Sequence, residues 1–584
     1  MNMESWKLIL SLLGVMSLFF SYCYCDKAPN YTFMKLATLA PQVSYYDYII
    51  IGGGTAGCAL AATLSERAHV LVLERGGAPY GNKIVEEMSK FGANLDDESA
   101  TSSAQPFVSE DGVVSSRARV LGGGSALNAG FYTRASTDYV AEAGWEGALV
   151  NESYTWVERK VAFKPPMLQF QSAFRDGLVE VGVKPYNGFT YDHIIGTKIG
   201  GTIFDHNGKR HTAADLLEYA HPNATVVYLF ATVHKILFKT KGQYSKRPKA
   251  HGVIFRDSKG IKHKAYVKAG NMNEIILSAG SMGSPQLLML SGIGPAAHLK
   301  ELGLKVMVDQ PMVGQGMTDN PMNAVIIPSP TPVEVSLIQA VGITDFGSYI
   351  EAASSANFAN SIIHSLPTSY KTSQPSSNQD KHEKTRLING KKEMINSDSG
   401  DETLYAGLIL EKIMGPLSSG HLLLKTINPK DNPSVTFNYF KEKEDLIRCV
   451  KGMETIVKVI NSKSFSKFRY PEIPVEDLLT TMLSLPLNRC QRPANDTGEF
   501  TTLEQFCKDT VMTIWHYHGG CQVGRVVDKD YKVYNVSGLR IVDGSTFYAS
   551  PGTNPQATVM MLGRYMGRRI LEERNAASKH AIGE

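Results

Sequence analysis

The sequence predicts an α/β protein organised around a dinucleotide-binding unit at residues 46–74. An apolar strand at 47–51 runs directly into the turn Gly52–Gly57, and an alanine-rich helix at 58–64 follows the turn. A second apolar strand at 69–73 then ends on Glu74. Strand, glycine turn, helix, strand and acid, within about 30 residues, form the fingerprint of a dinucleotide site.

Each residue type in this unit has a physical reason. Gly52 permits the tight turn, and Gly54 has no Cβ, so a pyrophosphate can approach the backbone. Gly57 allows the helix to pack closely on the strand. The helix N-terminus offers free N–H groups to phosphates, while Glu74 can accept hydrogen bonds from ribose hydroxyls. This pattern does not distinguish FAD from NAD.

Length and composition limit the remaining possibilities. The 584 residues suffice for a large core and at least two domains. The net charge of +4 is small, and no basic tract with interleaved aromatic residues is present, so nucleic acid is not an expected partner. The spacing of cysteine and histidine residues does not indicate a zinc site, so we expect no metal.

The N-terminus reads as a secretory signal peptide. Lys7 precedes an apolar run at 8–20, which is too short to span a bilayer comfortably, and small and polar residues follow. We predict a signal peptide at 1–25 that is cut near Cys25, with a signal anchor as the alternative. No other stretch is apolar enough to cross a membrane, so the mature chain should have no transmembrane span. The predicted location is the secretory pathway, extracellular space or cell wall.

Secretion changes how other residues are interpreted. Glycosylation acceptors of the type Asn-x-Ser/Thr occur at Asn30, Asn151, Asn223, Asn495 and Asn535. Cys58 lies in the dinucleotide helix and should be a small buried packing residue. An oxidising lumen permits a disulfide among the cysteines beyond it, which are Cys449, Cys490, Cys507 and Cys521.

Alternating strands and helices follow the first unit. Residues 27–45 should lie along the surface, and the glycine-rich segment 117–131 should place backbone against a flat or anionic ligand. We predict a helix at 211–217 and a turn at 278–285 that leads into a helix at 286–291. Apolar runs predict strands at 225–230, 231–238, 252–256, 264–267 and 274–277.

The C-terminal half carries the densest motifs. Strand-like runs occur within 336–353 and 404–425, and helical periodicity occurs at 445–462. The polar segment 367–403 reads as a mobile surface insertion. The remaining motifs are Trp515–Cys521, Leu539–Ser545 and Gly552–Thr558, the last of which opens a helix at 559–572.

These motifs together resemble the glucose–methanol–choline (GMC) oxidoreductases. The resemblance runs from about residue 46 to 573 and rests on five ordered motifs: the dinucleotide unit, 119–131, 278–294, the segment around His516 and the pair Asn554-Pro555. It implies an α/β (α+β overall) architecture. A Rossmann-type FAD-binding domain would be interleaved with a substrate domain built on a mostly antiparallel sheet. The implied FAD-binding parts are 44–135, 209–325 and 511–584, and the substrate-domain parts are 136–208 and 326–510.

The resemblance implies FAD as the cofactor. Some relatives attach it covalently through a histidine, but Leu127 occupies that position here, so we expect noncovalent FAD. The implied cofactor-binding residues come from four parts of the chain: Gly52, Gly54, Thr55, Ala56, Gly57, Glu74 and Arg75; Val120, Gly124, Asn128, Ala129, Gly130 and Phe131; Val233; and Trp515, His516, Asp543, Gly544, Asn554, Pro555 and Gln556.

The implied chemistry is oxidation of an alcohol at its CH–OH group. A neutral imidazole at His516 would take the hydroxyl proton, Asn554 would donate a hydrogen bond to the developing alkoxide, and the hydride would pass to flavin N5. We expect His518 to pack or hydrogen-bond nearby. The expected partner is a small-molecule alcohol, and the oligomeric state is not predicted.

Motif details place the resemblance in the plant branch of HOTHEAD-type proteins and (R)-mandelonitrile lyases. Cys449 and Cys507 match the disulfide of the lyases. Asn554, Ile514 and Tyr349 stand where the lyases carry a histidine, a tyrosine and a cysteine, so we expect a HOTHEAD-like enzyme. Substrate contacts are predicted at Tyr349, Ile514 and His516.

Three functions remain open. HOTHEAD-type proteins are associated with oxidation of long-chain ω-hydroxy fatty acids to ω-oxo acids, which makes such an oxidation the first hypothesis. A hydroxynitrile lyase that keeps FAD as a scaffold is the second. A non-catalytic secreted protein of the same fold is the third, and an intact pair of His516 and Asn554 argues against it.

Overall fold

The computed structural model describes residue 29 and residues 31–582, with gaps at 98, 100, 240–246, 271, 355–385, 389–390, 394–403, 486 and 489–498. The chain from Phe33 to Glu584 forms one compact unit. The predicted signal peptide, Asn30, Cys490, Asn495 and most of the insertion 367–403 lie outside the described residues.

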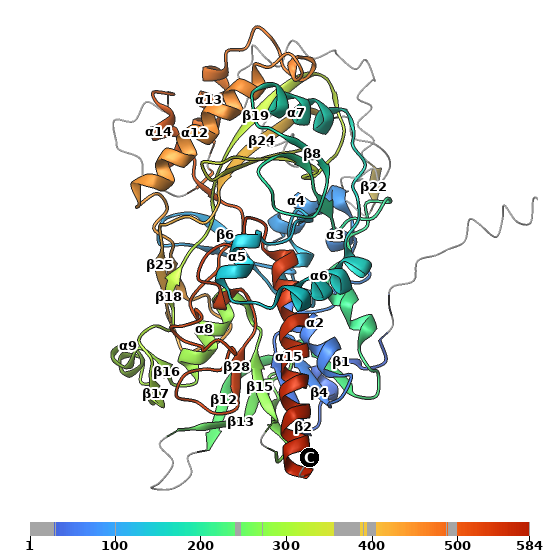
Figure 1. The fold of residues 1–584 in the computed structure, drawn as a ribbon, viewed down its shortest axis with the longest axis vertical. Coiled ribbons are helices and arrows are strands. Elements are labelled where there is room, and N and C mark those ends of the chain that lie inside the picture. Colours follow the sequence, from blue (N-terminus) through green and yellow to red (C-terminus); the bar gives the residue numbers. More distant parts are fainter. Residues whose placement is uncertain are drawn as a thin grey trace, which may run out of the picture. The chain divides into compact units, whose positions relative to one another are not determined.

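A six-stranded parallel sheet forms the centre of the dinucleotide-binding part (Figure 1). Its spatial order is β1-β11-β4-β3-β15-β28, and every neighbouring pair is parallel. Strands β3, β4 and β15 are buried along their whole length, as expected for apolar runs covered on both faces. The strands are β1 (Met34–Leu36), β11 (Thr225–Leu229), β4 (Val70–Leu73), β3 (Tyr48–Ile51), β15 (Glu274–Leu277) and β28 (Leu539–Ile541).

Helix α2 (Thr55–Leu64) follows β3 through the glycine turn. Gly52 has φ +102°, and a Cβ on Gly57 would lie 2.1 Å from the carbonyl oxygen of Gly52. Both positions therefore require glycine, for the reasons that the fingerprint predicts. The long helix α15 (Gln556–Ile582) packs against α2.

A second sheet of four strands has the order β12-β13-β14-β2. Its strands are β12 (Thr232–Lys239), β13 (Lys249–Arg256), β14 (Lys262–Val267) and β2 (Val43–Tyr46). The segment 27–45, which was expected to lie along the surface, instead supplies β1 to the edge of the parallel sheet and most of β2 to this one. The strands β1 and β2 are short, and each pairs with a strand far along the chain, β1 with β11 and β2 with β14. Their own residues therefore carry little signal for a strand.

A third sheet of seven strands is antiparallel except for its β8–β9 pair. Its order is β27 (Met512–Thr513), β19 (Pro321–Val333), β24 (Leu404–Ile413), β21 (Ser348–Ala353), β20 (Ala340–Ile343), β9 (Gly196–Ile199) and β8 (Tyr186–Phe189). The helices packed on it are α7 (Gln169–Glu180), α12 (Lys443–Ile460) and α13 (Val475–Ser484). This sheet matches the predicted antiparallel platform.

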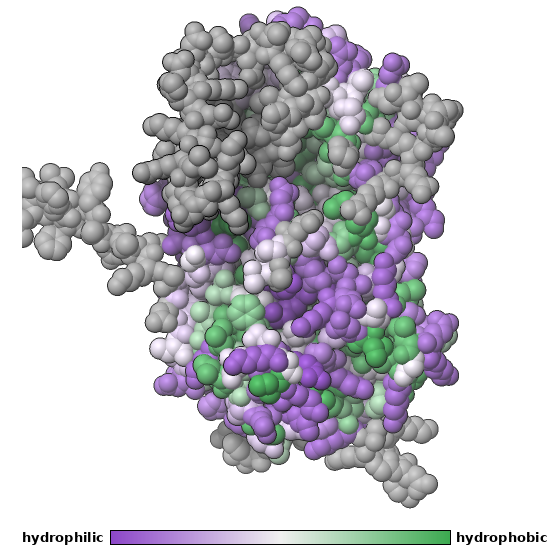
Figure 2. Space-filling view, turned by 180° about the vertical axis from the view of Figure 1, so that it is seen from behind, coloured by the Kyte–Doolittle hydropathy of each residue, from purple (hydrophilic) through white to green (hydrophobic). Residues whose placement is uncertain are grey.

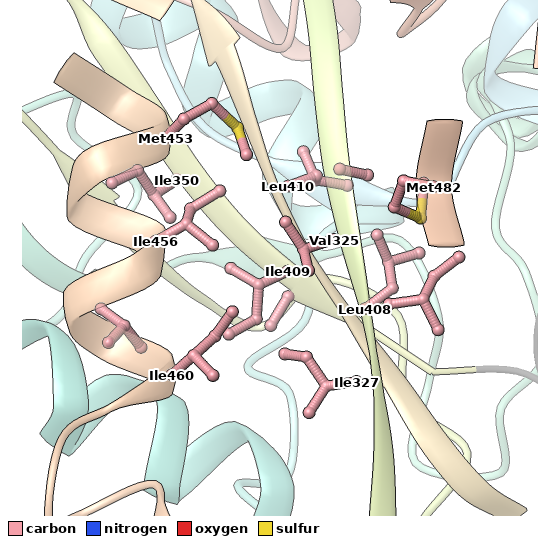
Figure 3. Close-up of a cluster of buried hydrophobic side chains, with 14 of the residues drawn as sticks. Val325, Ile327, Ile350, Leu408, Ile409, Leu410, Met453, Ile456, Ile460 and Met482 are labelled. Carbon is pink, nitrogen blue, oxygen red and sulfur yellow. The ribbon is translucent and has the colours of Figure 1, made fainter. Parts of the chain in front are cut away.

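The core of this part lies between the sheet and its helices. Figure 3 shows Met453, Ile456 and Ile460 of α12 directed toward Ile350 and Ile409 of the sheet. On β24, Leu408 and Leu410 lie near Met482 of α13 instead (Figure 3). Successive side chains of β24 therefore point to opposite faces of the sheet, and this alternation continues to the last residues of the strand.

Shorter elements connect these sheets. The helices are α3 (Lys83–Glu86), α4 (Phe91–Asp96), α5 (Thr137–Glu142), α6 (Gly147–Val161), α8 (Gly280–Leu290), α9 (Ala296–Glu301) and α14 (Leu503–Asp509). The 3₁₀ helices are η1 (Ala37–Leu39), η2 (Met88–Lys90), η3 (Gly123–Ala126), η4 (Ala213–Tyr219), η5 (Ser466–Phe468) and η6 (Gly544–Thr546). The strands are β5 (Ala104–Val108), β6 (Val114–Ala118), β7 (Phe131–Tyr132), β10 (Gly201–Thr202), β16 (Ile293–Gly294), β17 (Val308–Asp309), β18 (Gln315–Met317), β22 (Arg386–Ile388), β23 (Lys391–Glu393), β25 (Gly420–Leu423) and β26 (Ser434–Thr436).

The structure confirms the predicted α/β fold class, while element boundaries differ in several places. The helix predicted at 211–217 is the 3₁₀ helix η4, whose entry is capped by the Thr212 hydroxyl. Helix α8 begins at Gly280, inside the predicted turn, and α15 extends ten residues beyond the predicted 572. The domain boundaries inferred from the resemblance remain a prediction.

The surface is mixed. Figure 2 shows a face on which hydrophilic residues cover most of the described part, with smaller hydrophobic patches between them. Among the described residues, no helix is both long and apolar enough to cross a membrane.

Candidate active site

A first cavity lies where β3, β4 and β15 end and β12 begins, beside the start of α2. No side chain caps α2, so the N–H groups of its first turn remain available to a ligand. No atom beyond its chain neighbours lies within 4 Å of the place where a Cβ on Gly124 or Gly280 would stand. The predicted residues that line this cavity are Gly52, Gly54, Thr55, Ala56, Glu74, Arg75, Val120, Gly124, Val233, Trp515, Asp543, Gly544 and Pro555.

Two buried carboxylates fix the backbone around this cavity. Glu74 accepts hydrogen bonds from Gly53 N (2.9 Å) and Gly76 N (2.7 Å). Burial raises the pKa of Glu74, and those backbone donors oppose the rise. Asp543 likewise accepts from Gly280 N (2.9 Å). The cavity thus combines a glycine-lined helix start with an acid at the ribose end, which fits a dinucleotide with an unmodified adenosine ribose.

A second cavity adjoins the first, and both are lined by Thr55, Gly124, Trp515 and Pro555. Apolar side chains such as Leu95, Leu127 and Ile338 form much of its wall. The predicted residues that line it are Thr55, Gly124, Asn128, Ala129, Gly130, Phe131, Ile514, Trp515, His516, Asn554, Pro555 and Gln556. The two motifs that the sequence analysis singled out for chemistry therefore meet at one cavity.

Hydrogen bonds hold the wall of the second cavity near Asn128. Its amide nitrogen donates to Gln556 Oε1 (2.9 Å), and Gln556 in turn donates to Phe131 O (2.6 Å). Arg210 Nη1 donates to the carbonyl oxygen of Asn128 (2.5 Å). Arg210 was not predicted to be a site residue, although its position in the basic pair Lys209-Arg210 before a helix was visible in the sequence.

A buried aspartate shapes the turn that carries His516. Asp319 Oδ1 accepts from His516 N (3.0 Å), and Asp319 Oδ2 accepts from the Thr513 hydroxyl (2.6 Å). The Thr513 hydroxyl oxygen accepts from Trp515 N (2.8 Å), and Trp515 has φ +59°, a rare conformation for a large side chain. Burial raises the pKa of Asp319 to about 6, against these hydrogen bonds and that of Tyr439. Sequence reasoning did not identify Asp319.

The two histidines of the motif have different surroundings. His516 is 8% exposed, and burial, with Lys412 and His518 contributing, lowers its pKa well below the usual value. His518 Nδ1 lies 3.0 Å from the carbonyl oxygen of His516, so that nitrogen must carry the hydrogen. Burial lowers the pKa of His518 to about 4. Both rings are therefore neutral at neutral pH.

Asn554 faces a buried lysine. Its Oδ1 accepts from Lys412 Nζ (2.9 Å) and from the Thr553 hydroxyl (3.0 Å), and Lys412 is paired with Glu351 (2.6 Å). Neither Lys412 nor Glu351 was predicted. Each is a charged residue within an apolar run of a predicted strand region. Because charged residues are seldom buried without a partner, this interruption could have identified them as candidates.

Some predicted residues lie away from the cavity walls. Gly57 is buried in the packing of α2, and Tyr349 lines neither cavity. The Tyr349 ring instead lies 4.6 Å from Lys412 Nζ and stacks with His193 at 5.9 Å between centroids. A substrate contact of Tyr349 therefore stays a prediction, whereas Ile514 does line the second cavity.

The covalent features lie outside the cavities. A disulfide joins Cys449 of α12 to Cys507 of α14, the pair that the resemblance implied. Cys58 and Cys521 are free and buried. Of the described sequon residues, Asn151, Asn223 and Asn535 are all exposed, so each is accessible to glycosylation.

The fold and the joined cavities define a dinucleotide-binding enzyme. Residues 46–322 and 416–563 match two family models described as GMC oxidoreductase. Protein HOTHEAD of Arabidopsis thaliana is 49% identical over 95% of this chain and 93% of that protein. An (R)-mandelonitrile lyase-like protein of Arabidopsis thaliana is 44% identical over 97% of each chain. The chain belongs to the GMC oxidoreductase family.

The fold similarity extends to solved structures. Formate oxidase from Aspergillus oryzae superimposes with a TM-score of 0.71 at 17% identity, covering 92% of this chain and 100% of that one. Together with the family membership, this similarity identifies an FAD-dependent oxidoreductase.

Proposed function

We propose that the protein oxidises the CH–OH group of an alcohol, with His516 as the base and Asn554 as the partner of the alkoxide oxygen. The observation that carries the proposal is that both side chains line one cavity, which adjoins the dinucleotide cavity. An imidazole and a carboxamide beside a flavin match the two events of alcohol oxidation, loss of a proton and loss of a hydride.

The residues around the first cavity would hold the cofactor. The start of α2 would bind the phosphates in the space that the missing side chain of Gly280 leaves, Glu74 would bind the ribose, and Asn128 with Phe131 would border the ring system. FAD, when bound, supplies the acceptor for the two electrons of the hydride. Leu127, which cannot form a covalent attachment, supports noncovalent binding.

His516 is suited to accept a proton because its lowered pKa keeps the ring neutral. A ring that accepts at Nε2 must carry its own hydrogen at Nδ1, which lies 3.3 Å from the amide nitrogen of Asn320. The other oxygen–nitrogen orientation of that amide would let Asn320 Oδ1 accept this hydrogen. Within the described residues, Asn320 Oδ1 has no hydrogen-bond partner, whereas the amide nitrogen also donates to Ser550 Oγ (3.3 Å) and to the carbonyl oxygen of Thr553 (3.4 Å), so the rotation would exchange these two bonds for one with His516 Nδ1.

The substrate is proposed from the cavity wall and the resemblance. Leu95, Ile338 and Ile514 favour an apolar chain or ring next to the hydroxyl carbon. A long-chain ω-hydroxy fatty acid, oxidised to the ω-oxo acid, fits this wall and the HOTHEAD-like motifs. A hydroxynitrile lyase is the second candidate because a lyase-like relative is 44% identical. Asn554 and Ile514 argue against it.

We also propose secretion and glycosylation. The signal-peptide pattern at 1–25, the disulfide between Cys449 and Cys507, and three exposed sequons support passage through an oxidising compartment. Expression of the full chain in plant cells, followed by glycosidase treatment of the medium protein, tests this. An unglycosylated intracellular product would contradict it.

The test of function uses the purified protein under anaerobic conditions. Addition of an ω-hydroxy fatty acid, an aryl alcohol or a short alcohol should bleach the flavin absorption for one class and leave the others unreacted. Mandelonitrile is added separately, and cyanide release without flavin reduction would select the lyase. A protein that does neither would support the non-catalytic alternative.

His516→Ala should lower kcat by about 10²–10⁴ because the proton acceptor is lost. The bound FAD, measured from the visible spectrum, should stay stoichiometric. His421→Ala changes an exposed histidine on β25 and serves as the control. Unchanged turnover in His516→Ala would remove the assignment of the base.

A further inference from the structure

A buried ion pair stands behind the second cavity. Lys412 lies at the end of β24 and Glu351 on the neighbouring strand β21, and both side chains have 0% exposure. Lys412 Nζ and Glu351 Oε1 are 2.6 Å apart. Removing two charges from water costs several kcal/mol per ion, so such a pair seldom stabilises a fold more than apolar residues would. Its presence beside the cavity that Asn554 lines therefore suggests a functional role.

The alternation of β24 aims this pair at the active site. Ile409 faces α12, as does Glu411, whose carboxylate would lie 2.7 Å from a Cβ on Gly452 of that helix. Lys412 therefore points to the opposite face of the sheet, where it meets Asn554. Glu411 and Lys412 are adjacent on β24, but their side chains lie on opposite faces of the sheet.

The ammonium group determines which way the Asn554 amide is turned. Lys412 Nζ has three donors and no acceptor, so the Asn554 atom at 2.9 Å must be the oxygen. The Thr553 hydroxyl donates to the same oxygen at 3.0 Å. With its oxygen engaged twice, the amide has only N–H donors left, which it shares between Glu351, whose pKa a hydrogen bond from Asn554 lowers, and a molecule in the cavity that Asn554 lines.

We propose that Lys412, held in place by Glu351, is the positioning residue that keeps the donor end of Asn554 available to the substrate oxygen. This inference rests on the proposed function, in which that oxygen develops negative charge. An amide turned the other way would place its oxygen against the alkoxide and repel it. Lys412 acts through Asn554 and need not contact the substrate.

The charge of Lys412 also reaches the base. The groups that face His516 are Asp319 from the β18–β19 connection, Lys412 from β24 with Glu351 behind it, and His518 from its own segment. Burial lowers the pKa of His516 most, and Lys412 lowers it next. Loss of the ammonium charge should therefore shift the acid limb of kcat/KM to higher pH, which a purely structural lysine would not do.

The main test replaces both charges to avoid leaving one of them buried alone. Lys412→Met with Glu351→Gln should lower kcat about 10-fold or more, since one fixed alkoxide donor contributes of that order or above. Bound FAD should be unchanged, and the acid limb should move upward. Glu411→Gln is the matched control, because it changes the neighbouring buried carboxylate, which bonds to Ser348 (2.8 Å) and not to Asn554.

A second variant keeps the ion pair and needs no change in the sheet. Asn554→Asp still offers an oxygen to Lys412 but loses both N–H donors. It should be slower than Asn554→Ala, because the acid adds repulsion to the missing bond. Asn554→Asp with activity at or above that of Asn554→Ala would overturn the orientation argument.

Binding provides a readout that is independent of turnover. A tertiary alcohol has no hydride to give, and its Kd is measured from the perturbation of the bound FAD spectrum. Asn554→Ala and the Lys412/Glu351 double variant should each weaken binding, and their combination should weaken it no further. Additive losses of binding free energy in the combined variant would overturn the proposal. An acid limb of kcat/KM that stays at the wild-type pH in the double variant would also overturn it. If no alcohol reduces the wild-type flavin, the proposed function fails, while this coupling still tests the positioning role.

Discussion

At the scale of single residues, the site depends on charged groups that water does not reach. Asp319 holds the backbone of the turn bearing His516, and Lys412 with Glu351 sets the amide of Asn554. Each is buried, so each carries a desolvation cost that its hydrogen bonds offset in part. Such groups leave a signature in the pH dependence of stability.

Asp319 should make the folded protein less stable as pH rises from about 4 to 6. Its pKa is 3.8 in the unfolded chain and about 6 in the fold, so the fold binds the proton more tightly, and this contribution is lost as pH passes through 6. The free energy of unfolding relative to Asp319→Asn should fall by up to about 3 kcal/mol across this window. Denaturant titrations of both proteins at several pH values measure the difference. A difference that does not vary with pH would show that Asp319 does not titrate there.

At the scale of elements, the fit of α15 against α2 positions both the cofactor turn and Asn554. A Cβ on Gly563 would lie 2.3 Å from the carbonyl oxygen of Ala56, and one on Gly567 would lie 2.7 Å from Thr63. The two helices can approach this closely because α15 presents glycine there. The close approach of α2 and α15 therefore depends on glycine at positions 563 and 567.

Gly563→Ala should destabilise the protein by about 1–3 kcal/mol, because the new methyl group has no space. It should also weaken FAD retention, since α2 begins at the phosphate turn. Gly147→Ala, at the start of α6 where no atom lies within 4 Å of the added Cβ, is the matched control and should be close to neutral. Thermal unfolding followed by flavin fluorescence measures both effects. Equal stability of the two variants would contradict the packing argument.

The disulfide acts at the same scale. It links α12 to α14 across a sequence separation of 58 residues, and both cysteines are buried. Replacing Cys449 and Cys507 by serine together should lower the free energy of unfolding by about 2–4 kcal/mol. Reductant should destabilise the wild type and leave the double variant unaffected. A reductant effect of equal size in both proteins would mean that another disulfide contributes.

At the scale of the whole molecule, the cofactor site is assembled from distant parts of the chain. The parallel sheet alone takes strands from 34–36, 48–51, 70–73, 225–229, 274–277 and 539–541. A ligand that contacts several of these segments stabilises all of them together, because it binds the folded chain alone.

Removal of FAD should therefore lower the unfolding temperature of the whole protein in one transition. Adding FAD back at a hundredfold excess over its Kd should restore about 3 kcal/mol. Calorimetry of the holo, apo and reconstituted protein measures this, with NAD as the control ligand. Restoration by NAD to the same degree would contradict the assignment of the cofactor.

Much of the site could be predicted because its residues sit in short continuous motifs. The glycine turn, Glu74, His516 and Asn554 each stand in a local pattern whose chemistry is readable. Asp319, Asn320 and Arg210 stand in segments without such a pattern, and they gain their roles from contacts with residues about 80 or more positions away. Local sequence carries no signal for a partner that distant.

The sequence by itself determined the α/β class, the dinucleotide turn and the identity of the two chemical groups, because strand periodicity and glycine spacing are local properties. The tertiary structure decided that Lys412 reaches Asn554, that Tyr349 lies behind the cavity and not in its wall, and that the leader completes two sheets. These outcomes depend on strand register and on the face to which each side chain points. Both are set by pairing between remote segments, which no local pattern records.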